Sequence, residues 1–241
     1  MKLETMTWRE VDSYLVDNTG ILLPTGSIEQ HGPIGLIGTD AICAREIAWA
    51  AADICSGVVA PELAYAPAPF NMGFPGTVSV TPDLFTELAL QVVTGLAHHG
   101  FTKIYVLNGH GANLDPLRRV ADTAHIDIRI KSWWDFDPVN VLRHTWYGTW
   151  EGMHATPSEV SITQHTHRVV DAPDMGPPRK LSPDYIRAHA GDKHGPPDDH
   201  RRDFPDGRVG SYSELACPEH GAELVTTAAR AVSEDFAEFT R

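Results

Sequence analysis

The segment SIEQHGPIGLIGTD, residues 27–40, contains three side chains whose chemistry differs from that of their neighbours. Glu29, His31 and Asp40 lie among glycines and aliphatic residues, directly after the apolar run GILLPTG, residues 20–26. They are either solvated loop residues or groups that converge on something positive. Carboxylates and imidazole together suit Zn²⁺, Mn²⁺ or Fe²⁺. The segment is therefore a candidate part of a metal site.

Two other segments offer ligands of the same kind. His110 lies between glycines after the β-rich run IYVLN, and His154 and Glu159 lie in EGMHATPSEVS, residues 151–161, where a loop leads into a helical pattern. One carboxylate shared by two ions is the usual way to hold a metal pair ~3.5–4 Å apart. Five or six donors from four separated loops therefore suit two divalent ions with open coordination positions.

Structural roles are the alternative for each of these residues. Glu29 can cap a helix, and Asp40 can serve as an N-cap. His31 can donate to a loop carbonyl, and His110 can be a core histidine whose ring nitrogens are hydrogen-bonded. Surface positions are predicted for the histidines of the later, polar segments: His165, His167, His189, His194 and His200.

The elements that must position these groups follow from the hydrophobic pattern. Apolar β-rich runs alternate with longer helical patterns, which predicts crossover connections and a mainly parallel sheet covered on both faces. Strands are expected at 20–26, 57–66, 102–111 and 126–134, and helices at 40–55, 81–100, 114–125, 158–170 and 218–239. Ligands of such sheets bind beyond the carboxyl ends of the strands. Both GSIEQHG and NGHGAN come just after a strand, so we expect them to form one site.

Residues 171–213 are rich in proline, glycine and charge, and we expect this segment to be irregular and to lie on the surface. It either covers the site or forms part of a subunit contact. The tryptophans at 133, 134, 146 and 150 are predicted to pack, with a role for one of them in covering a substrate as the alternative.

Composition restricts the class of protein. The 241 residues suit one domain with a full core. A formal charge of −13 argues against a nucleic-acid partner. Three scattered cysteines suggest a reducing compartment. The polar N-terminal stretch is unlike a signal peptide, and no apolar run approaches the ~20 residues of a membrane span. We therefore expect a cytoplasmic protein without a membrane partner.

Several motifs together resemble the creatininase (creatinine amidohydrolase) family. The segment LPTGSIEQHGPIGLIGTD is similar to the family's signature, and four further motifs follow in the family's order: FPGTVS, VLNGHGAN, MHATPSEVS and DGRVGSYSELACPEHGAELV. The resemblance extends from about Leu22 to Val225. It implies an α/β fold of three layers, α/β/α, with a mostly parallel sheet in a single domain over residues 1–241. It also implies two divalent metal ions, a homo-oligomer that is commonly a hexamer, and hydrolysis of C–N bonds in small amides.

The resemblance also implies roles for individual residues. Asp40 matches the carboxylate that bridges the two ions. Glu29 and His110 complete the ligands of one ion, and His31 and Glu159 complete those of the other. His154 matches a histidine near the substrate and is a candidate proton carrier, so His154 and Glu159 are the candidate catalytic residues. The expected reaction is attack of metal-activated water on an amide carbon, with the backbone amides of residues 109–111 as candidate donors to the oxyanion.

Departures from the family pattern affect the substrate more than the metal ligands. Creatininases have a glutamate at the position of Ala112, and many relatives have a histidine at the position of Ile34. Three residues after His154, where the family usually has an acidic residue, this sequence has Pro157. We therefore expect a small amide other than creatinine, a formamide, a cyclic amide or a short modified peptide as substrate. Two alternatives remain: a mononuclear variant of the same hydrolase, and a catalytically silent metal-binding assembly subunit.

Overall fold

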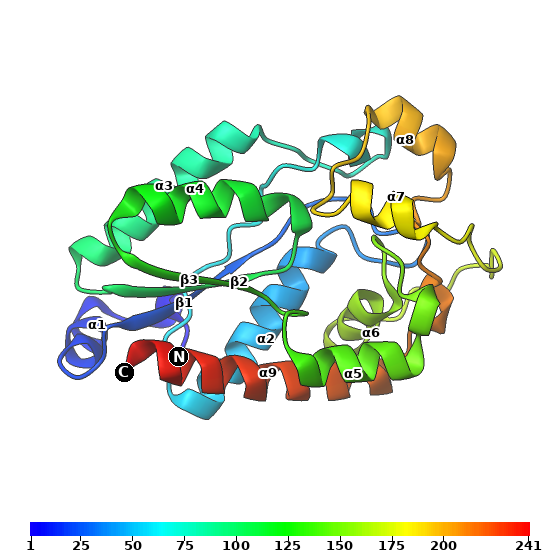
Figure 1. The fold of residues 1–241 in the computed structure, drawn as a ribbon. Coiled ribbons are helices and arrows are strands. Elements are labelled where there is room, and N and C mark those ends of the chain that lie inside the picture. The colour runs from blue at the N-terminus through cyan, green and yellow to red at the C-terminus, as the bar shows by residue number, and fades with distance from the viewer.

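A computed structural model describes residues 1–241, and its centre is a three-stranded parallel sheet (Figure 1). The strands are β1 (Gly20–Thr25), β2 (Lys103–Asn108) and β3 (Asp127–Ser132), hydrogen-bonded in the order β1-β2-β3. The register places Thr25, Asn108 and Ser132 side by side at the carboxyl ends. The loops that follow the three strands therefore leave the sheet at the same edge.

Helices surround this sheet, and their bounds complete the description of the fold. The α-helices are α1 (Trp8–Leu15), α2 (Thr39–Cys55), α3 (Pro82–His98), α4 (Leu114–Ala124), α5 (Asp137–Trp146), α6 (Pro157–Thr166), α7 (Pro183–Ala188), α8 (Pro197–Asp203) and α9 (Pro218–Thr240). Short 3₁₀ helices are η1 (Leu3–Thr5), η2 (Pro69–Gly73), η3 (Gly111–Asn113), η4 (Gly148–Trp150) and η5 (Ser213–Leu215). None of the helices is both long and apolar enough to cross a lipid bilayer.

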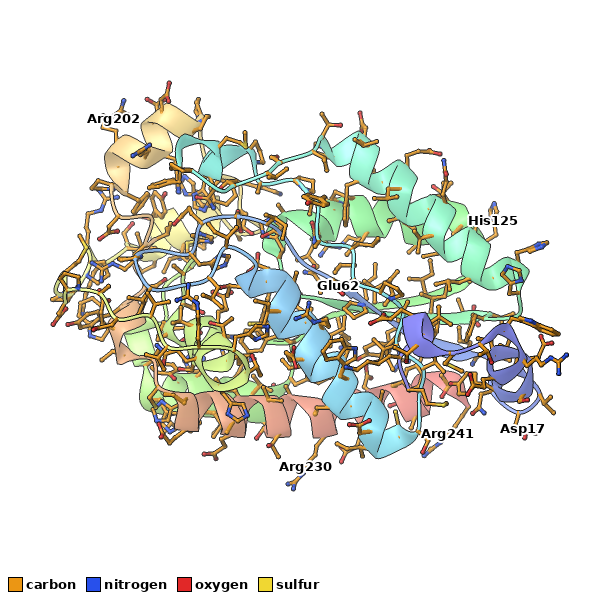
Figure 2. All side chains as sticks on the ribbon, turned by 180° about the vertical axis from the view of Figure 1, so that it is seen from behind. Asp17, Glu62, His125, Arg202, Arg230 and Arg241 are labelled. Atoms are coloured by element: carbon orange, nitrogen blue, oxygen red, sulfur yellow. The ribbon has the colours of Figure 1, made fainter.

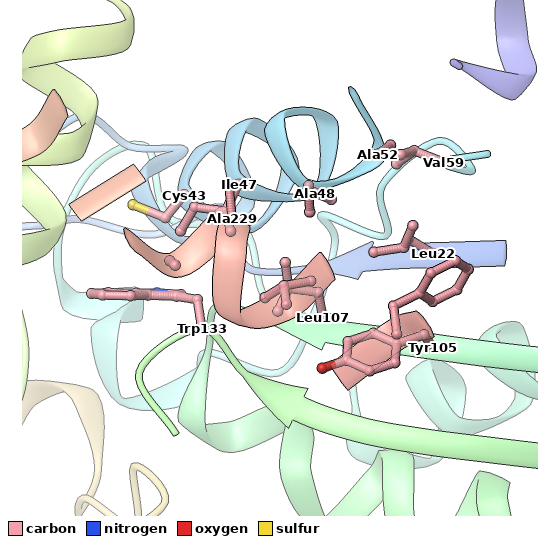
Figure 3. Packing of buried hydrophobic residues seen from close by; sticks show 14 of the residues in the cluster. Leu22, Cys43, Ile47, Ala48, Ala52, Val59, Tyr105, Leu107, Trp133 and Ala229 are labelled. Atoms are coloured by element: carbon pink, nitrogen blue, oxygen red, sulfur yellow. The ribbon is translucent and has the colours of Figure 1, made fainter. Parts of the chain in front are cut away.

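The alternation of side chains along the strands produces two cores. Leu22, Tyr105 and Leu107 pack against α2 and α9, as the close view in Figure 3 shows. The neighbours that point to the opposite face, including Ile21 and Ile104, pack against α3, α4 and α1. The sheet is thus covered on both faces, with α3 and α4 above it and α2 and α9 below it in Figure 1. This confirms the predicted three-layer α/β/α fold.

Charged side chains lie mainly on the outside of these layers. Figure 2 shows Arg202 on α8 and Arg230 on α9 pointing away from the body of the molecule, and both are exposed. The buried carboxylates described below are therefore exceptions that need a physical reason.

The strand predicted at 57–66 is replaced by a series of isolated bridges. Val59 pairs with Lys2 and Leu22, and Leu63 pairs with Thr25. The segment runs along the free edge of β1, but Pro24 in the strand and Pro61 in the segment provide no amide hydrogens. The ladder therefore cannot become continuous there.

The irregular segment predicted at 171–213 contains two short helices, so that prediction is wrong in part. The Ser182 side chain caps α7 by accepting from the Tyr185 amide, and Pro183 occupies the first helical position. Pro197 has the corresponding place in α8. Proline at a first helical position was the feature in the sequence that could have located both helices.

Candidate metal centre

The site lies beyond the carboxyl ends of the strands, where the sequence pattern placed it. The chain after β1 brings Glu29 and His31, and the chain after β2 brings His110. Asp40 lies in the first turn of α2, and Glu159 lies in the first turn of α6. Both carboxylates thus lie at helix N-termini, which favour negative charge.

Two glycines allow α2 to approach the strand ends. A Cβ at Gly26 would collide with the backbone of Ala41, and a Cβ at Gly109 would collide with the carbonyl oxygen of Asp40. The first turn of α2 therefore packs directly on the backbone that follows β1 and β2. This contact puts the Asp40 carboxylate between the two loops that contain the histidines.

The structure brings all the predicted ligands together in two sets that share Asp40. Glu29, Asp40 and His110 form one group whose ligand atoms lie within 4.8 Å of one another, and His31, Asp40 and Glu159 form the other. His31 Nε2 is 2.8 Å from Asp40 Oδ1, and His110 Nδ1 is 2.9 Å from Asp40 Oδ2. Each Asp40 oxygen thus faces a different histidine, which is the arrangement that a bridging carboxylate requires.

The hydrogen bonds of the two histidines direct one nitrogen of each ring toward Asp40. His110 Nε2 donates to the Pro67 carbonyl at 2.7 Å, and His31 Nδ1 lies 3.2 Å from the Glu29 carbonyl. Because a carbonyl oxygen accepts, each of these nitrogens bears a hydrogen, and the lone pair of the neutral imidazole is on the opposite nitrogen, which faces Asp40. Such outer hydrogen bonds are typical of histidines that bind metals.

The carboxylates are held in a similar way. Asp40 Oδ2 accepts from the Ser27 hydroxyl at 2.8 Å, Glu29 Oε2 accepts from the Asn71 side chain at 2.7 Å, and Glu159 Oε2 accepts from the Thr156 amide at 2.9 Å. Glu29 is fully buried, and its Oε1 makes no well-formed hydrogen bond but lies 3.1 Å from His110 Nδ1. A buried carboxylate is costly unless a positive charge compensates it, which a protonated histidine or a metal cation can do. The donor set therefore fits a divalent metal centre.

The electrostatics of the site lead to the same conclusion. Burial opposes ionisation of Asp40, but the His31 and His110 imidazoles hold the pKa of that carboxyl well below its usual range. Burial likewise opposes charge on His31, but the Asp40 carboxylate raises the pKa of His31 to about 10. Burial raises the pKa of Glu159 to about 7, and the Asp40 charge adds to the rise. The site thus takes up protons to offset its negative charge, and a cation supplies the same compensation.

His154 is buried beside the two ligand sets. Its Nε2 donates to the Gln30 carbonyl at 2.7 Å, and its Nδ1 lies 3.8 Å from Glu29 Oε1. Burial, together with the nearby His31, lowers the pKa of His154 to about 4, so the ring is neutral at pH 7. A neutral imidazole with a free Nδ1 can accept a proton and return it. His154 also forms a possible third ligand set with Glu29 and His31.

A cavity of about 160 Å³ opens directly onto the candidate ligands. Asp40, His110, His154 and Glu159 line one side of it, and the other lining residues include Trp134, Arg143, Met153 and Asp192. Trp134 follows β3, and it is the tryptophan of the predicted cluster that borders the cavity. Trp133 is instead part of the core.

The expectation that the backbone amides of residues 109–111 serve an oxyanion is wrong for two of the three amides. The amide of Gly109 donates to the Thr25 carbonyl at 2.8 Å, and the amide of His110 lies 3.2 Å from Asn108 Oδ1, which accepts from it. These two hydrogens hold the loop in place and cannot serve an oxyanion, so the Gly111 amide is the candidate that remains. Asn113 also supports the loops, because its side chain donates to the Gly26 carbonyl at 2.9 Å.

Residues of the segment 171–213 were missed or misplaced by the sequence analysis. Asp192 lines the cavity, and His200 is buried rather than on the surface. The His194 side chain is 1% exposed and packs on Phe70. The flanking glycines in AGDKHG were the one available indication that Asp192 lies in a close turn. The expectation that this segment covers the site is supported by Gly191 and Asp192 in the cavity lining, and a role in a subunit contact stays a prediction.

Comparisons with known proteins agree with the motifs. The family model described as "Creatininase: Creatinine amidohydrolase" matches residues 4–236. Among curated proteins, the chain is 34% identical to 3-dehydro-scyllo-inosose hydrolase of Thermotoga maritima over 45% of this chain and 35% of that protein. It is 33% identical to the mycofactocin precursor peptide peptidase of Mycolicibacterium smegmatis over 54% of each chain. It is 26% identical to creatinine amidohydrolase of Pseudomonas putida over 70% of this chain and 75% of that one. The first two matches thus span about half or less of the relative's length.

Solved structures agree with the fold over almost the whole chain. A crystal structure of creatinine amidohydrolase (creatininase) superposes with a TM-score of 0.78 at 22% identity, covering 99% of this chain and 97% of that one. A structure titled "Creatininase Mn" gives 0.77 at 22% identity over 99% and 98% of the chains. A mutant creatininase of "Zn-Zn type" gives 0.72 at 22% identity, also over 99% and 98%.

Proposed function

The chain belongs to the creatininase family, and on that premise we propose that it is a metal-dependent amidohydrolase. Its substrate is a small molecule or a short modified peptide, and it cleaves a C–N bond of an amide, formamide or cyclic amide. The observation that supports this best is the pair of ligand sets, of mostly buried side chains, that share Asp40.

We propose two divalent ions per subunit, Zn²⁺, Mn²⁺ or Fe²⁺. Glu29 and His110 would hold one, His31 and Glu159 the other, and Asp40 would bind both. The solved creatininases titled with Mn and with Zn-Zn support a divalent metal. Such ions would supply Lewis-acid chemistry, polarising a carbonyl and bringing the pKa of water toward ~7.

The chain's own residues provide the rest of the reaction. His154 is placed to take a proton at Nδ1 and to return it to the leaving nitrogen, which is a poor leaving group until it is protonated. The Gln30 carbonyl fixes the orientation of this imidazole. The segment 171–213 supplies Asp192 as part of the cavity wall and so excludes water from one side.

The cavity supports a small substrate group. Its volume of about 160 Å³ is well below the roughly 300–1,000 Å³ of pockets for drug-sized ligands. Arg143 places a guanidinium in a wall otherwise rich in carboxylates. Arg143 Nε donates to Glu151 Oε1 and Nη1 donates to Asn140 Oδ1, both at 2.8 Å, whereas Nη2 has no partner within the protein. This group is placed to hold a carbonyl or carboxylate of the substrate.

The test combines metal content with activity. Protein purified without chelator is supplemented with Mn²⁺, Zn²⁺ or Fe²⁺, desalted and measured by elemental analysis, alongside Asp40→Asn. It is then assayed on a panel of formamides, lactams and short peptides. We expect two ions per chain, their loss in the variant, and hydrolysis within the panel. One tightly bound ion with activity would favour the mononuclear alternative. Bound metal without any hydrolysis would favour the silent assembly subunit, and no bound metal would refute the proposal.

We also propose that the protein forms a homo-oligomer in the cytoplasm. Leu84 and Leu88 lie one turn apart on α3 and are 56% and 43% exposed, which suits a contact surface. The three cysteines are all free thiols, which suits a reducing compartment. Light scattering after size-exclusion chromatography would measure the mass in solution, with a hexamer as the expected form.

A further inference from the structure

A fourth carboxylate reaches the metal centre from a segment that contains none of the predicted ligands. Asp192 lies between α7 and α8, its side chain is 12% exposed, and it lines the same cavity as Asp40 and Glu159. Its backbone has φ of +56°, a left-handed conformation that aspartate tolerates better than most residues. The turn thus holds an acidic side chain toward the site rather than toward solvent.

The contacts of Asp192 are made with the loop that contains His110. Asp192 Oδ2 accepts from the Ala112 amide at 3.1 Å and lies 3.7 Å from His110 Nδ1. That nitrogen is the one that also faces Glu29 and Asp40. A Cβ at Gly111 would collide with the Asp192 carboxylate, so the glycine between His110 and Ala112 is what allows this approach.

The negative charge of the site explains why a further carboxylate there favours the binding of cations. Glu29 and Asp40 are buried beside His110, whose Nδ1 lies 3.1 Å from Glu29 Oε1 and 2.9 Å from Asp40 Oδ2. A further carboxylate in the same place increases the repulsion unless cations are present. With Glu159 and Asp192 the site has four carboxylates, which together balance the charge of two divalent ions.

We propose that Asp192 is an additional carboxylate of the metal centre, and that through it metal binding fastens the segment 171–213 over the cavity. This inference rests on the proposed function, because it requires a metal-binding site. It differs from a purely structural role, in which the Ala112 hydrogen bond alone anchors the turn. The two roles are separable, since Asp192→Asn removes the charge and retains an oxygen that can accept from Ala112.

The experiment measures metal affinity and protection from proteolysis, not activity. Metal-stripped wild type, Asp192→Asn and the control Asp198→Asn are titrated with Mn²⁺ by calorimetry. Asp198 is exposed in α8 of the same segment and away from the cavity lining. The same samples are treated with trypsin, which can cut after Arg187 and Lys193, whose side chains are 71% and 65% exposed.

We expect Mn²⁺ to protect these tryptic sites in the wild type and in Asp198→Asn. In Asp192→Asn the Kd for Mn²⁺ should rise about 10- to 100-fold, and protection should require correspondingly more metal. Without metal, Asp192→Asn should have at least the melting temperature of the wild type, because a repelling charge is removed. A weaker affinity would then not be due to misfolding.

Equal Mn²⁺ affinity and equal protection in Asp192→Asn and wild type would overturn the inference while leaving the proposed function intact. A wild type that binds no Mn²⁺ would overturn both. A metal-free Asp192→Asn that melts well below the wild type would also contradict the inference, because it would show that the carboxylate stabilises the fold without metal.

Discussion

At the scale of single residues, the sequence identified candidate ligands that the structure brings together. Glu29, His31, Asp40 and His110 were identified from residue type and from their place after strands, and the structure brings them within contact of one another. Asp192 was missed because its contact with the Ala112 amide is made between segments 80 residues apart. No local pattern predicts such a contact. His194 and His200 were misplaced for the same reason, since their burial depends on Phe70.

The Ser27 hydroxyl provides a test of how Asp40, the proposed bridging carboxylate, is oriented. Ser27 Oγ donates to Asp40 Oδ2 at 2.8 Å, and both side chains are buried. We expect Ser27→Ala to fold and to bind metal about 10- to 100-fold more weakly, because outer partners of ligands have effects of that size. Competition with a metal-binding dye measures the affinity. Ser13→Ala, on the exposed helix α1, is the control and should bind as the wild type does.

Arg143 allows a test of substrate charge. If its free Nη2 holds an acidic group, Arg143→Gln should raise KM for acidic amides such as N-formylglycine about 10- to 100-fold, with a smaller effect on kcat. The neutral N-formylglycinamide should be much less affected. Arg143→Lys retains the charge beside Glu151 and tests whether the loss is due to charge or to packing. Equal effects on both substrates would assign Arg143 a structural role.

Glu159 predicts a pH dependence for the metal-free protein. Burial raises its pKa to about 7, above its unfolded value of 4.5, so between these values the folded state binds more protons than the unfolded state. Ionisation of Glu159 is therefore more costly in the folded state than in the unfolded state. The free energy of unfolding is highest, as far as this group is concerned, below pH ~4.5, and it falls as the pH rises through ~7. Glu159→Gln removes the titration, so its stability relative to the wild type should increase by about 2 kcal/mol between pH 5 and pH 8. Urea unfolding at both pH values, in chelator, measures the difference. A constant difference would contradict the assignment.

At the scale of elements, the sequence located those with strong periodicity or clear caps. The helix predicted at 81–100 begins as expected, with the Thr81 side chain accepting from the Leu84 amide and Pro82 at the first position. The segment 57–66 was wrong because its apolar pattern suits a strand while Pro61 interrupts the ladder. Whether such an edge becomes a strand depends on the pairing partner, which the pattern does not include.

The packing of α2 on the sheet is tested by a pair of glycine substitutions. Gly26→Ala places a methyl group against the Ala41 backbone, so it should destabilise the protein by about 3 kcal/mol or more and displace Asp40. Gly95→Ala lies in α3, where an added Cβ meets no atom within 4 Å. This control should stabilise the protein by about 0.5–1 kcal/mol because alanine favours a helix. Denaturant unfolding measures both values. Tolerance of Gly26→Ala would contradict the close packing.

At the scale of the whole molecule, the net charge of −13 and the charge of the site act differently. Most acidic side chains face solvent, where salt screens them. The carboxylates of the site are buried at the meeting point of β1, β2, α2 and α6, so salt has little access to them. The composition predicted an acidic, globular protein, but it could not distinguish the exposed acidic side chains from the buried carboxylates of the site. That separation depends on the fold.

Removal of the metal distinguishes the buried carboxylates of the site from the exposed acidic side chains. Each proposed ion, present at 100 times its Kd, would stabilise the folded state by about 2.7 kcal/mol, which for a chain of this size corresponds to a loss of roughly 5–11 °C in Tm for each ion that chelation removes. Since the repelling carboxylates are buried, 0.5 M NaCl should restore little of that loss, whereas 1 mM Mn²⁺ should restore it almost fully. Calorimetry with and without chelator measures this. Recovery by NaCl equal to that by Mn²⁺ would mean that general surface repulsion, and not a specific site, sets the stability of the metal-free protein.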